Sequence, residues 1–181
     1  EKIRISLYRP YSKQQLYFDK VFNEMQLKIP QIFPNIHLNN RVIMVCGKGT
    51  KKGFSSLISD ITPDLNLLEA GAQCFPLYLY EKEENSENYQ RHDAITDEAL
   101  THFKAAYPNF DKEDMFYYIY GLLHSEEYRE KYADNLSKQL PRIPCVKSAV
   151  DFWAFSKAGR ELAELHLNYE TVPMYQNVLF K

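Results

Sequence analysis

The stretch "YYIYGLLHSEEYREKY", residues 117–132, sets five tyrosines beside a single histidine and a run of charged residues. Apolar side chains recur here at the i, i+3, i+4 and i+7 spacing of one helix face, namely Phe116, Ile119, Tyr120 and Leu123. Tyr128 and Tyr132 repeat at i+4 on what we expect to be a second helix. Stacking of nucleic-acid bases would need exposed rings on a basic surface, whereas the neighbours of these rings are mostly acidic. The stretch therefore predicts a buried seam between two helices, with Tyr120 and Tyr128 in the core.

Capping residues mark where the helices begin. Thr96 precedes "DEALTHFKAAY", Asp111 precedes "KEDMFYYIYGLLH", and Ser125 precedes "EEYREKYADNLSKQL". Asp114 stands where the partner of a capping box would stand. His124 falls at a helix C-terminus, where it is expected to cap free carbonyl groups and needs no catalytic role. With a last helix over about Val150 to Leu167, the pattern predicts a C-terminal part of about four helices.

The first 80 residues favour β-strands instead. In "KIRISLYRP" the apolar residues alternate with polar ones, which predicts a half-buried strand with Ile3, Ile5 and Leu7 inside. "QQLYFDK" follows as a second strand across a short turn, and "NEMQLKIPQIF" predicts a short helix broken at its prolines. Val42 to Cys46, "FSSLISDI" and "AQCFPLYLYE" supply the remaining strands. The predicted fold class is α+β, with a small mixed or antiparallel sheet packed against the helices.

The charges divide along the chain in the same way as the expected elements. Residues 1–80 hold ten Lys/Arg and six Asp/Glu, and residues 81–181 hold twelve and eighteen, so the two parts carry about +4 and −6. "EKEENSENYQRHD", residues 81–93, is acidic and free of aliphatic side chains, which is typical of a mobile loop. We therefore expect a single domain over 1–181, with a basic β-rich part (1–80), an acidic loop (81–95) and a helical part (96–181).

Composition favours a cytoplasmic protein. The longest apolar runs fall well short of the roughly 18 residues that a bilayer span requires, and no signal peptide is recognisable, so no membrane partner is expected. Three scattered cysteines predict neither a disulfide framework nor a paired metal site. The chain opens on Glu1 rather than Met, which suggests a fragment of a longer polypeptide.

Catalytic motifs are not recognisable in the sequence. "CGKGTKKG" follows a strand but does not satisfy the phosphate-binding pattern GxxxxGK[ST], and Cys46 lacks the arginine of a cysteine phosphatase. No lysine has an acidic residue two positions before it, as a common nuclease motif requires. The motifs of an amino-methyltransferase are missing as well, and the five histidines show no metal-ligand spacing. We expect no catalytic residue, no metal site and no cofactor in this chain.

One basic loop remains as a candidate binding site. Lys48, Lys51 and Lys52 lie among the glycines of "GKGTKKG" after a buried strand, and ammonium groups with free backbone amides suit phosphate oxygens. Arg9, Lys13 and Arg41 are expected to join the loop if the strands pair as predicted. The lysines would hold phosphates, while Arg9 or Arg41 would reach base edges in the major groove of duplex DNA. The alternative is a merely solvated hairpin tip.

Several phrases together resemble a known family. "LYRPYSKQQLYFDK", "FPLYLYE", "MFYYIYGLLHSEEYREKYADNLSKQLPRIP" and "DFWAFSKAGRELAELHLNYE" are similar to the C-terminal portion of single-polypeptide type I (type ISP) restriction-modification enzymes. That family joins a nuclease, a helicase-like translocase, an adenine methyltransferase and a target recognition domain in one chain. The resemblance covers nearly all of residues 3–170, although residues 35–72 match poorly. It implies a C-terminal target recognition domain for duplex DNA, in a parent that uses ATP, Mg²⁺ and S-adenosylmethionine.

Two functions therefore stay open at this point. The first is a DNA-reading module, with the methyltransferase and translocase domains of the same chain as its partners. The second is a protein-interaction module whose helical part docks onto those domains and has little DNA affinity of its own. Salt-sensitive binding to duplex DNA would separate the two, because binding to phosphates releases counterions.

Overall fold

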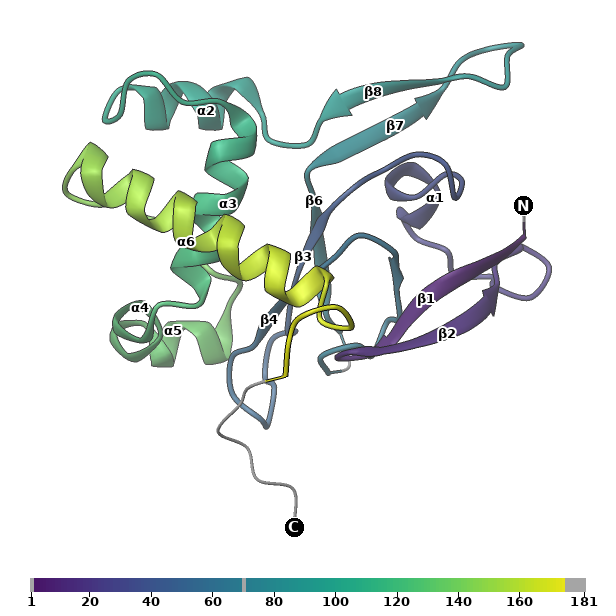
Figure 1. Ribbon diagram of the computed structural model, residues 1–181, viewed down its shortest axis with the longest axis horizontal. Helices are drawn as coiled ribbons and strands as arrows, with labels where there is room; N and C mark the ends of the chain where they lie inside the picture. The colour runs from purple at the N-terminus through teal and green to yellow at the C-terminus, as the bar shows by residue number, and fades with distance from the viewer. Residues whose placement is uncertain (1, 70, 175–181) are drawn as a thin grey trace.

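The computed structural model describes residues 2–69 and 71–174. The strands and the short helix α1 lie on one side, and helices α2 to α6 lie on the other (Figure 1). The strands are β1 Ile3–Arg9, β2 Ser12–Tyr17, β3 Val42–Val45, β4 Ser56–Ser59, β5 Thr62–Pro63, β6 Gln73–Pro76, β7 Tyr78–Lys82 and β8 Tyr89–Asp93. The helices are α1 Ile29–Ile32, α2 Asp97–Lys104, α3 Lys112–Leu123, α4 Glu126–Lys131, α5 Ala133–Lys138 and α6 Ala149–Leu167. The α+β fold class is thus confirmed, with the outermost residues of the expected 1–181 domain lying outside the described ranges.

The strands form three small sheets, ordered β2-β1-β5, β4-β3-β6 and β7-β8. In the first sheet, β1 pairs antiparallel with β2 and parallel with β5. In the second, β3 pairs antiparallel with both neighbours. The mixed and antiparallel pairing is the one that the sequence predicts.

The first strand buries only part of the face that was expected inside: Leu7 is buried as predicted, but Ile3 and Ile5 are not. Arg4 and Ser6 are buried, while Ile3 and Ile5 are 61% and 47% exposed. Arg4 Nη1 donates to the Phe33 carbonyl oxygen at 2.8 Å, and its guanidinium lies 4.5 Å from the centre of the Phe18 ring. A carbonyl at the end of α1 and an aromatic face thus hold the cation inside, so the alternation in β1 locates a strand but not its buried face.

The central strand β3 is buried along its whole length. Ile43 and Val45 share one core cluster with Ile58 of β4 and with residues of the helices α2, α3, α4, α5 and α6. On the other face, Val42 and Met44 pack in a second cluster that includes Leu7 of β1. The buried strand predicted over Val42 to Cys46 is confirmed, and it joins the two halves of the chain.

Residues 81–93 are not the open loop that we expected. Most of them belong to the β7–β8 hairpin, in which Tyr80 pairs with Arg91 and Glu81 with Gln90. The Arg91 guanidinium lies 4.3 Å from the centre of the Tyr78 ring. Tyrosines and the stem of an arginine here supply the cross-strand packing that aliphatic side chains usually provide, which is why the polar composition concealed the hairpin.

Helix α3 is the centre of the helical part. Its residues from Met115 to Leu123 are all buried except Ile119, which is half-buried, so the helix is covered on every side rather than along one stripe. Asp111 and Asp114 form the expected capping box, and Thr96, Ser125 and Ser148 cap their helices. Tyr120 and Tyr128 are buried, as predicted.

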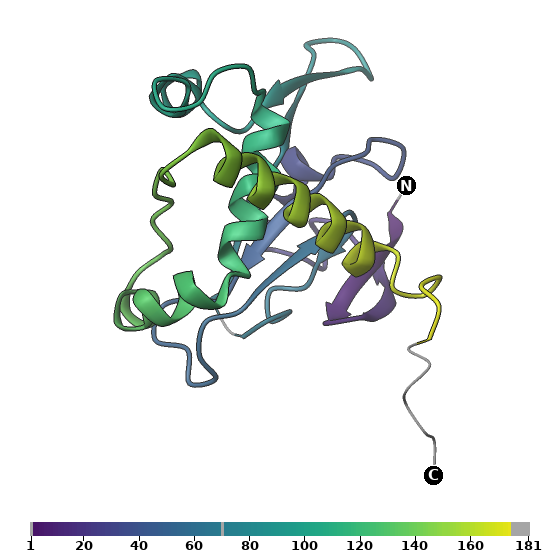
Figure 2. The same cartoon turned by 60° about the vertical axis from the view of Figure 1, so that its left-hand side comes forward.

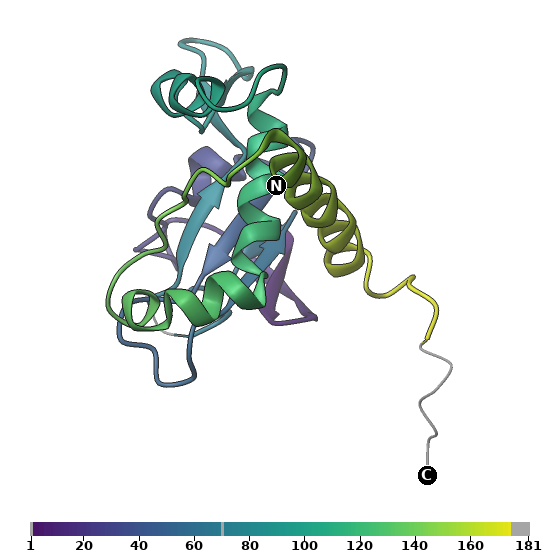
Figure 3. The same cartoon turned by 90° about the vertical axis from the view of Figure 1, so that its left-hand side faces the viewer.

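Helices α3 and α6 cross and pack closely (Figure 2). Gly121 and Gly159 face each other at the crossing, where a Cβ on Gly159 would overlap the Tyr117 carbonyl oxygen and one on Gly121 would overlap that of Phe155. Helix α6 also contacts β4, because it carries apolar residues on more than one face. Figure 3 shows α3 and α4 passing in front of the central sheet.

Two of the predicted helices differ in detail. The helix expected over residues 126–140 is divided at Tyr132 into α4 and α5, so the helical part has five helices in the described residues rather than about four. The helix expected before Pro34 contains only Ile29–Ile32, and Pro30 lies in its first turn instead of breaking it. Proline fits the first turn of a helix because its missing amide hydrogen would have no partner there.

Candidate nucleic-acid interface

The lysine loop, Gly47–Gly53, connects β3 to β4 and has a defined conformation. Gly49 and Gly53 have φ angles of 73° and 80°, a left-handed backbone that favours glycine. The Thr50 hydroxyl donates to the Glu69 carboxylate, and the Lys51 amide lies 3.4 Å from Glu69 Oε1. The loop is therefore fixed at its middle by an acidic side chain from the β5–β6 connection.

The three lysines of this loop point into solvent. Lys48, Lys51 and Lys52 are exposed, and within residues 2–69 and 71–174 none of them forms an ion pair. Free ammonium groups on a fixed backbone can bind phosphate oxygens without first breaking an internal ion pair. The structure thus brings together three of the six basic residues that the sequence singled out.

A fourth lysine, Lys138, joins the loop from the helical part. The Gly49 amide donates to the Ser137 carbonyl oxygen at 3.1 Å, which places the end of α5 against the loop. Lys138, the next residue, is exposed and belongs to no ion pair among the described residues. Sequence reasoning missed Lys138, because packing between a loop and a helix some 90 residues later leaves no local pattern.

Arg9 lies at the end of β1 and contacts the same β5–β6 connection as the loop. Its Nη1 is 3.3 Å from Asp64 Oδ1, and its guanidinium stacks 4.0 Å from the centre of the Tyr8 ring. Glu69, five residues after Asp64, holds the lysine loop. Arg9 and the loop are therefore neighbours of one segment rather than direct neighbours of each other.

Lys13 and Arg41 are engaged with the C-terminal part of the chain. Lys13 Nζ is 2.6 Å from Glu170 Oε2, and this carboxylate raises the pKa of the lysine. Arg41 Nη2 is 3.2 Å from Glu164 Oε1, and Nη1 donates to the Tyr117 hydroxyl. Arg41 precedes β3 whereas the lysine loop follows it, so the two stand at opposite ends of that strand and the structure does not bring them together.

A buried polar cluster joins α3, α6 and β4. The Tyr120 hydroxyl accepts from the Ile58 amide at 3.2 Å and lies 2.6 Å from His166 Nδ1. His124 caps α3, and burial, with help from Arg129 and His166, lowers its pKa to about 4. Burial also lowers the pKa of His166. The Tyr120 hydroxyl thus links α3 to β4 and to α6, which is a structural role.

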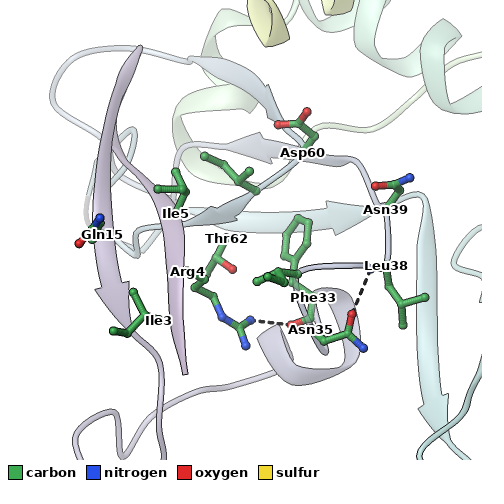
Figure 4. A pocket seen from close by; sticks show the side chains of 12 residues that line it. Ile3, Arg4, Ile5, Gln15, Phe33, Asn35, Leu38, Asn39, Asp60 and Thr62 are labelled. Carbon is green, nitrogen blue, oxygen red and sulfur yellow. Dashed lines mark hydrogen bonds between the residues drawn. The ribbon is translucent and has the colours of Figure 1, made fainter. Parts of the chain in front are cut away.

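A cavity of about 410 Å³ opens beside β1, away from the lysine loop (Figure 4). Its wall includes the exposed Ile3 and Ile5, the ring of Phe33, and the polar side chains of Asn39 and Thr62. Figure 4 shows Arg4 reaching across it to the Phe33 carbonyl. The Arg4 guanidinium is already bonded to the Phe33 carbonyl, and a phosphate would have to displace that bond. The cavity is therefore a weaker phosphate site than the lysine loop.

Residues 2–69 and 71–174 were also compared with the patterns of metal sites and membrane spans. No group of three or more His, Cys, Asp or Glu side chains there is arranged to hold a metal ion. No helix in those ranges is both long enough and apolar enough to cross a membrane.

In fold, the chain is an α+β domain that presents a basic loop at one end of its central sheet. Comparison with protein families is more specific: the chain belongs to the type ISP C-terminal specificity domain family, whose model matches residues 1–179. It is therefore a target specificity domain of the type ISP restriction-modification enzymes, as its sequence phrases predicted. A search of curated proteins returned no match.

Three solved structures are similar over 97% of this chain. The type ISP enzyme LlaBIII bound to DNA is 36% identical with a TM-score of 0.88, and a DrdV–DNA complex is 42% identical with a TM-score of 0.87. A nuclease-deletion mutant of the type ISP enzyme LlaGI, in complex with a DNA substrate mimic, is 35% identical with a TM-score of 0.80. The chain spans only 12%, 17% and 14% of those chains, respectively.

Proposed function

We propose that this domain reads a duplex DNA sequence for a larger restriction-modification enzyme and performs no catalysis itself. The observation that carries the proposal is that the same fold, over 97% of this chain, occurs in enzymes whose structures contain DNA or a DNA mimic. Nuclease, translocase and adenine methyltransferase activities, with ATP, Mg²⁺ and S-adenosylmethionine, would belong to other parts of the parent chain. The role of this domain is to select where they act.

Within the domain, we assign phosphate binding to the lysine loop with Lys138. Their ammonium groups are free, so each would release counterions on binding and contribute to salt dependence but not to sequence choice. Arg9 is the best placed of the arginines to reach a base edge. Its ion pair with Asp64 is half exposed, and pairs of that kind contribute only about 0–1 kcal/mol, so DNA can displace the carboxylate.

Lys13 and Arg41 lie apart from the lysine loop, and we propose a separate role for each. Lys13 has a similarly exposed partner in Glu170 and could bind DNA at the hairpin tip. Arg41 is held by Tyr117 as well as Glu164, and it lies at the far end of β3 from the loop. We therefore assign Arg41 to the packing of sheet against helices, and it becomes the weakest of the six candidates for DNA binding.

Domain exchange in the parent enzyme tests the proposal. Residues 1–179 would be replaced by the corresponding domain of a relative, and methylated sites would be mapped by sequencing genomic DNA from cells with and without each enzyme. The methylated sequence should change to that of the donor domain. An unchanged methylation motif would show that target choice resides elsewhere in the parent chain.

A further inference from the structure

Four large apolar side chains stand in solvent just after β2. Val21, Phe22, Met25 and Leu27 are 82%, 77%, 81% and 70% exposed, and we call them the 21–27 face. On the helical side, Val150 is comparably exposed at 78%, and on the same helix Trp153 and Leu165 are less exposed, at 40% and 51%. Single exposed apolar residues are ordinary, whereas a contiguous group marks a surface that another molecule or domain covers.

The 21–27 face continues into a groove of about 510 Å³ between the β1–β2 hairpin and the central sheet. Met25 and Leu27 line it, together with Phe18, Ile29, Leu65 and Leu79. An apolar chain segment placed in the groove would bury the groove wall and the exposed face together. The site therefore fits a partner with apolar side chains.

The face is built on an ordered turn rather than a loose loop. Asp19 Oδ1 accepts from the Val21 amide at 2.9 Å, and Asn23 Oδ1 accepts from the Asp19 amide at 2.9 Å. The Phe22 ring meets the Tyr17 ring with centroids 5.6 Å apart. These interactions order the turn from Asp19 to Asn23 and hold the Phe22 ring in place.

The same turn is tied to the first residues of β1. Lys2 Nζ lies 2.7 Å from Asp19 Oδ2, and the Phe18 amide donates to the Lys2 carbonyl oxygen at 2.6 Å. The family is described as a C-terminal domain, and the chain spans only 12% to 17% of its relatives. Long polypeptide segments therefore precede this domain in such enzymes and reach it beside the 21–27 face.

DNA is a poor occupant for this surface. The segment of residues 21–27 runs at the right-hand edge of the view in Figure 1, on the opposite side of the molecule from helices α2 to α6, whereas the lysine loop lies at the lower left. Lys20 and Lys28 are exposed at the two ends of the segment, but a phosphate backbone laid across the four apolar side chains between them would lose hydration there without an ion pair. Burial of the same side chains against apolar protein surface is favourable.

We propose that the 21–27 face and its groove pack against the polypeptide that precedes this domain in the parent enzyme. This interdomain interface sets the position of the domain, and with it the lysine loop, relative to the rest of the chain. The inference rests on the family assignment and on exposed apolar surface, and it does not require the lysine loop to bind DNA. The docking surface is thus on the N-terminal hairpin side and not on the helical part.

Methionine oxidation in the full-length parent enzyme tests the interface directly. Met25 and Met174 are 81% and 67% exposed in this domain, while Met44 and Met115 are 1% and 4% exposed. Dilute hydrogen peroxide is applied without DNA, and each methionine is followed by mass spectrometry of tryptic peptides. Met25 should oxidise on the order of tenfold more slowly than Met174, because oxidation follows exposure. Oxidation of Met25 as fast as Met174 would overturn the proposal.

The same oxidation measurement, repeated after dilution and after addition of duplex DNA, distinguishes other molecules that could cover the 21–27 face. Protection of Met25 that disappears when the enzyme is diluted would identify a second copy of the chain as the occupant. Protection that arises only after duplex DNA is added would identify DNA. Either result contradicts packing within one chain, which requires protection at every concentration and without DNA.

A pair of matched variants in the full-length enzyme completes the test. Phe22→Asp places a charge on the 21–27 face, and Val150→Asp places the same charge on an equally exposed site of α6. Phe22→Asp should raise the oxidation rate of Met25 and expose the segment before β1 to limited proteolysis, whereas Val150→Asp should do neither. Identical behaviour of the two variants would refute the interface even if DNA recognition is intact.

Discussion

Helix α3 and the 21–27 face both concentrate large apolar side chains, but those of α3 are buried and those of the 21–27 face are exposed. Tyr117, Tyr118 and Tyr120 are at most 1% exposed, whereas the side chains of the 21–27 face are at least 70% exposed. The α3 tyrosines find partners within the chain, since the Tyr118 hydroxyl donates to the Pro144 carbonyl and the Tyr120 hydroxyl accepts from the Ile58 amide. Apolar content alone therefore does not identify the core. The difference is whether complementary surface exists in the same domain.

The largest contrast should come from two tyrosines, Tyr120 of α3 and Tyr17 of β2, whose ring contacts Phe22 of the 21–27 face. Tyr120→Ala removes a ring that is fully buried and also hydrogen-bonded to β4, so it should lower the free energy of unfolding by about 4 kcal/mol. Tyr17→Ala, at a ring that is 44% exposed, should cost about 1 kcal/mol or less. Urea unfolding followed by circular dichroism measures both values. Equal losses of stability would mean that the burial assigned to α3 is wrong.

The crossing of α3 and α6 offers a second test of the buried region. Gly159→Ala adds one carbon against the rigid Tyr117 carbonyl, and such overpacking should cost about 2–3 kcal/mol despite the better helix propensity of alanine. Lys157→Ala on the exposed face of the same helix is the control and should change the unfolding free energy by about 0.5 kcal/mol or less. Stabilisation by Gly159→Ala would show that the helices do not touch there.

Acid should lower the Tm of the domain through the buried histidines of the cluster around Tyr120. Burial lowers the pKa of His124 from 6.5 to about 4, so between these values the unfolded chain takes up a proton that the folded chain refuses. The depressed folded pKa therefore makes Tm fall as pH decreases from 6.5 toward 4, and it has no effect above that window. Burial of His166 acts in the same direction.

Replacement of the buried histidine isolates this effect. His124→Gln should flatten the decline of Tm with pH, measured by differential scanning calorimetry, while His102→Gln on the exposed side of α2 should leave the decline as in the wild type. If both variants retain the full decline, His124 is not the group that destabilises the fold in acid.

The smallest effect is expected at the exposed face itself. Val21→Ser in this chain should change the free energy of unfolding by about 0.5 kcal/mol or less, because an 82% exposed side chain packs against little of its own domain. Chemical denaturation provides the measurement. Destabilisation by about 2 kcal/mol would mean that the face is packed against this domain, and the proposed interdomain interface would have no basis.

The parts of the fold that were predictable have local causes. Helix caps at Thr96, Asp111 and Ser125 depend on side chains within three residues, and the sequence displays them directly. The buried strand at Val42 to Val45 is a continuous apolar run with no ambiguity about its face. The core position of Tyr120 followed from the same periodic spacing.

The parts that were not predictable depend on partners distant in sequence. Arg4 is inside because the Phe33 carbonyl and the Phe18 ring receive it, which alternation in β1 cannot reveal. Lys138 lies beside the lysine loop because the Gly49 amide donates to the carbonyl oxygen of the preceding residue, Ser137. The ion pair of Arg41 with Glu164 links residues 123 positions apart, so its separation from the lysine loop was equally hidden.

The salt dependence of DNA binding tests the central claim about function most directly. In the full-length enzyme, Lys48, Lys51 and Lys52 are changed together to alanine, and affinity for duplex DNA is measured over a series of salt concentrations. A second triple variant of exposed lysines on the helical side, Lys104, Lys147 and Lys157, makes the same change in net charge.

The loop variant should bind every duplex more weakly, and the slope of log affinity against log salt should fall by about one unit for each phosphate that the loop no longer binds. The control variant should keep the wild-type slope. Unchanged affinity and slope in the loop variant, or equal changes in both variants, would contradict the assignment of the lysine loop to the DNA surface.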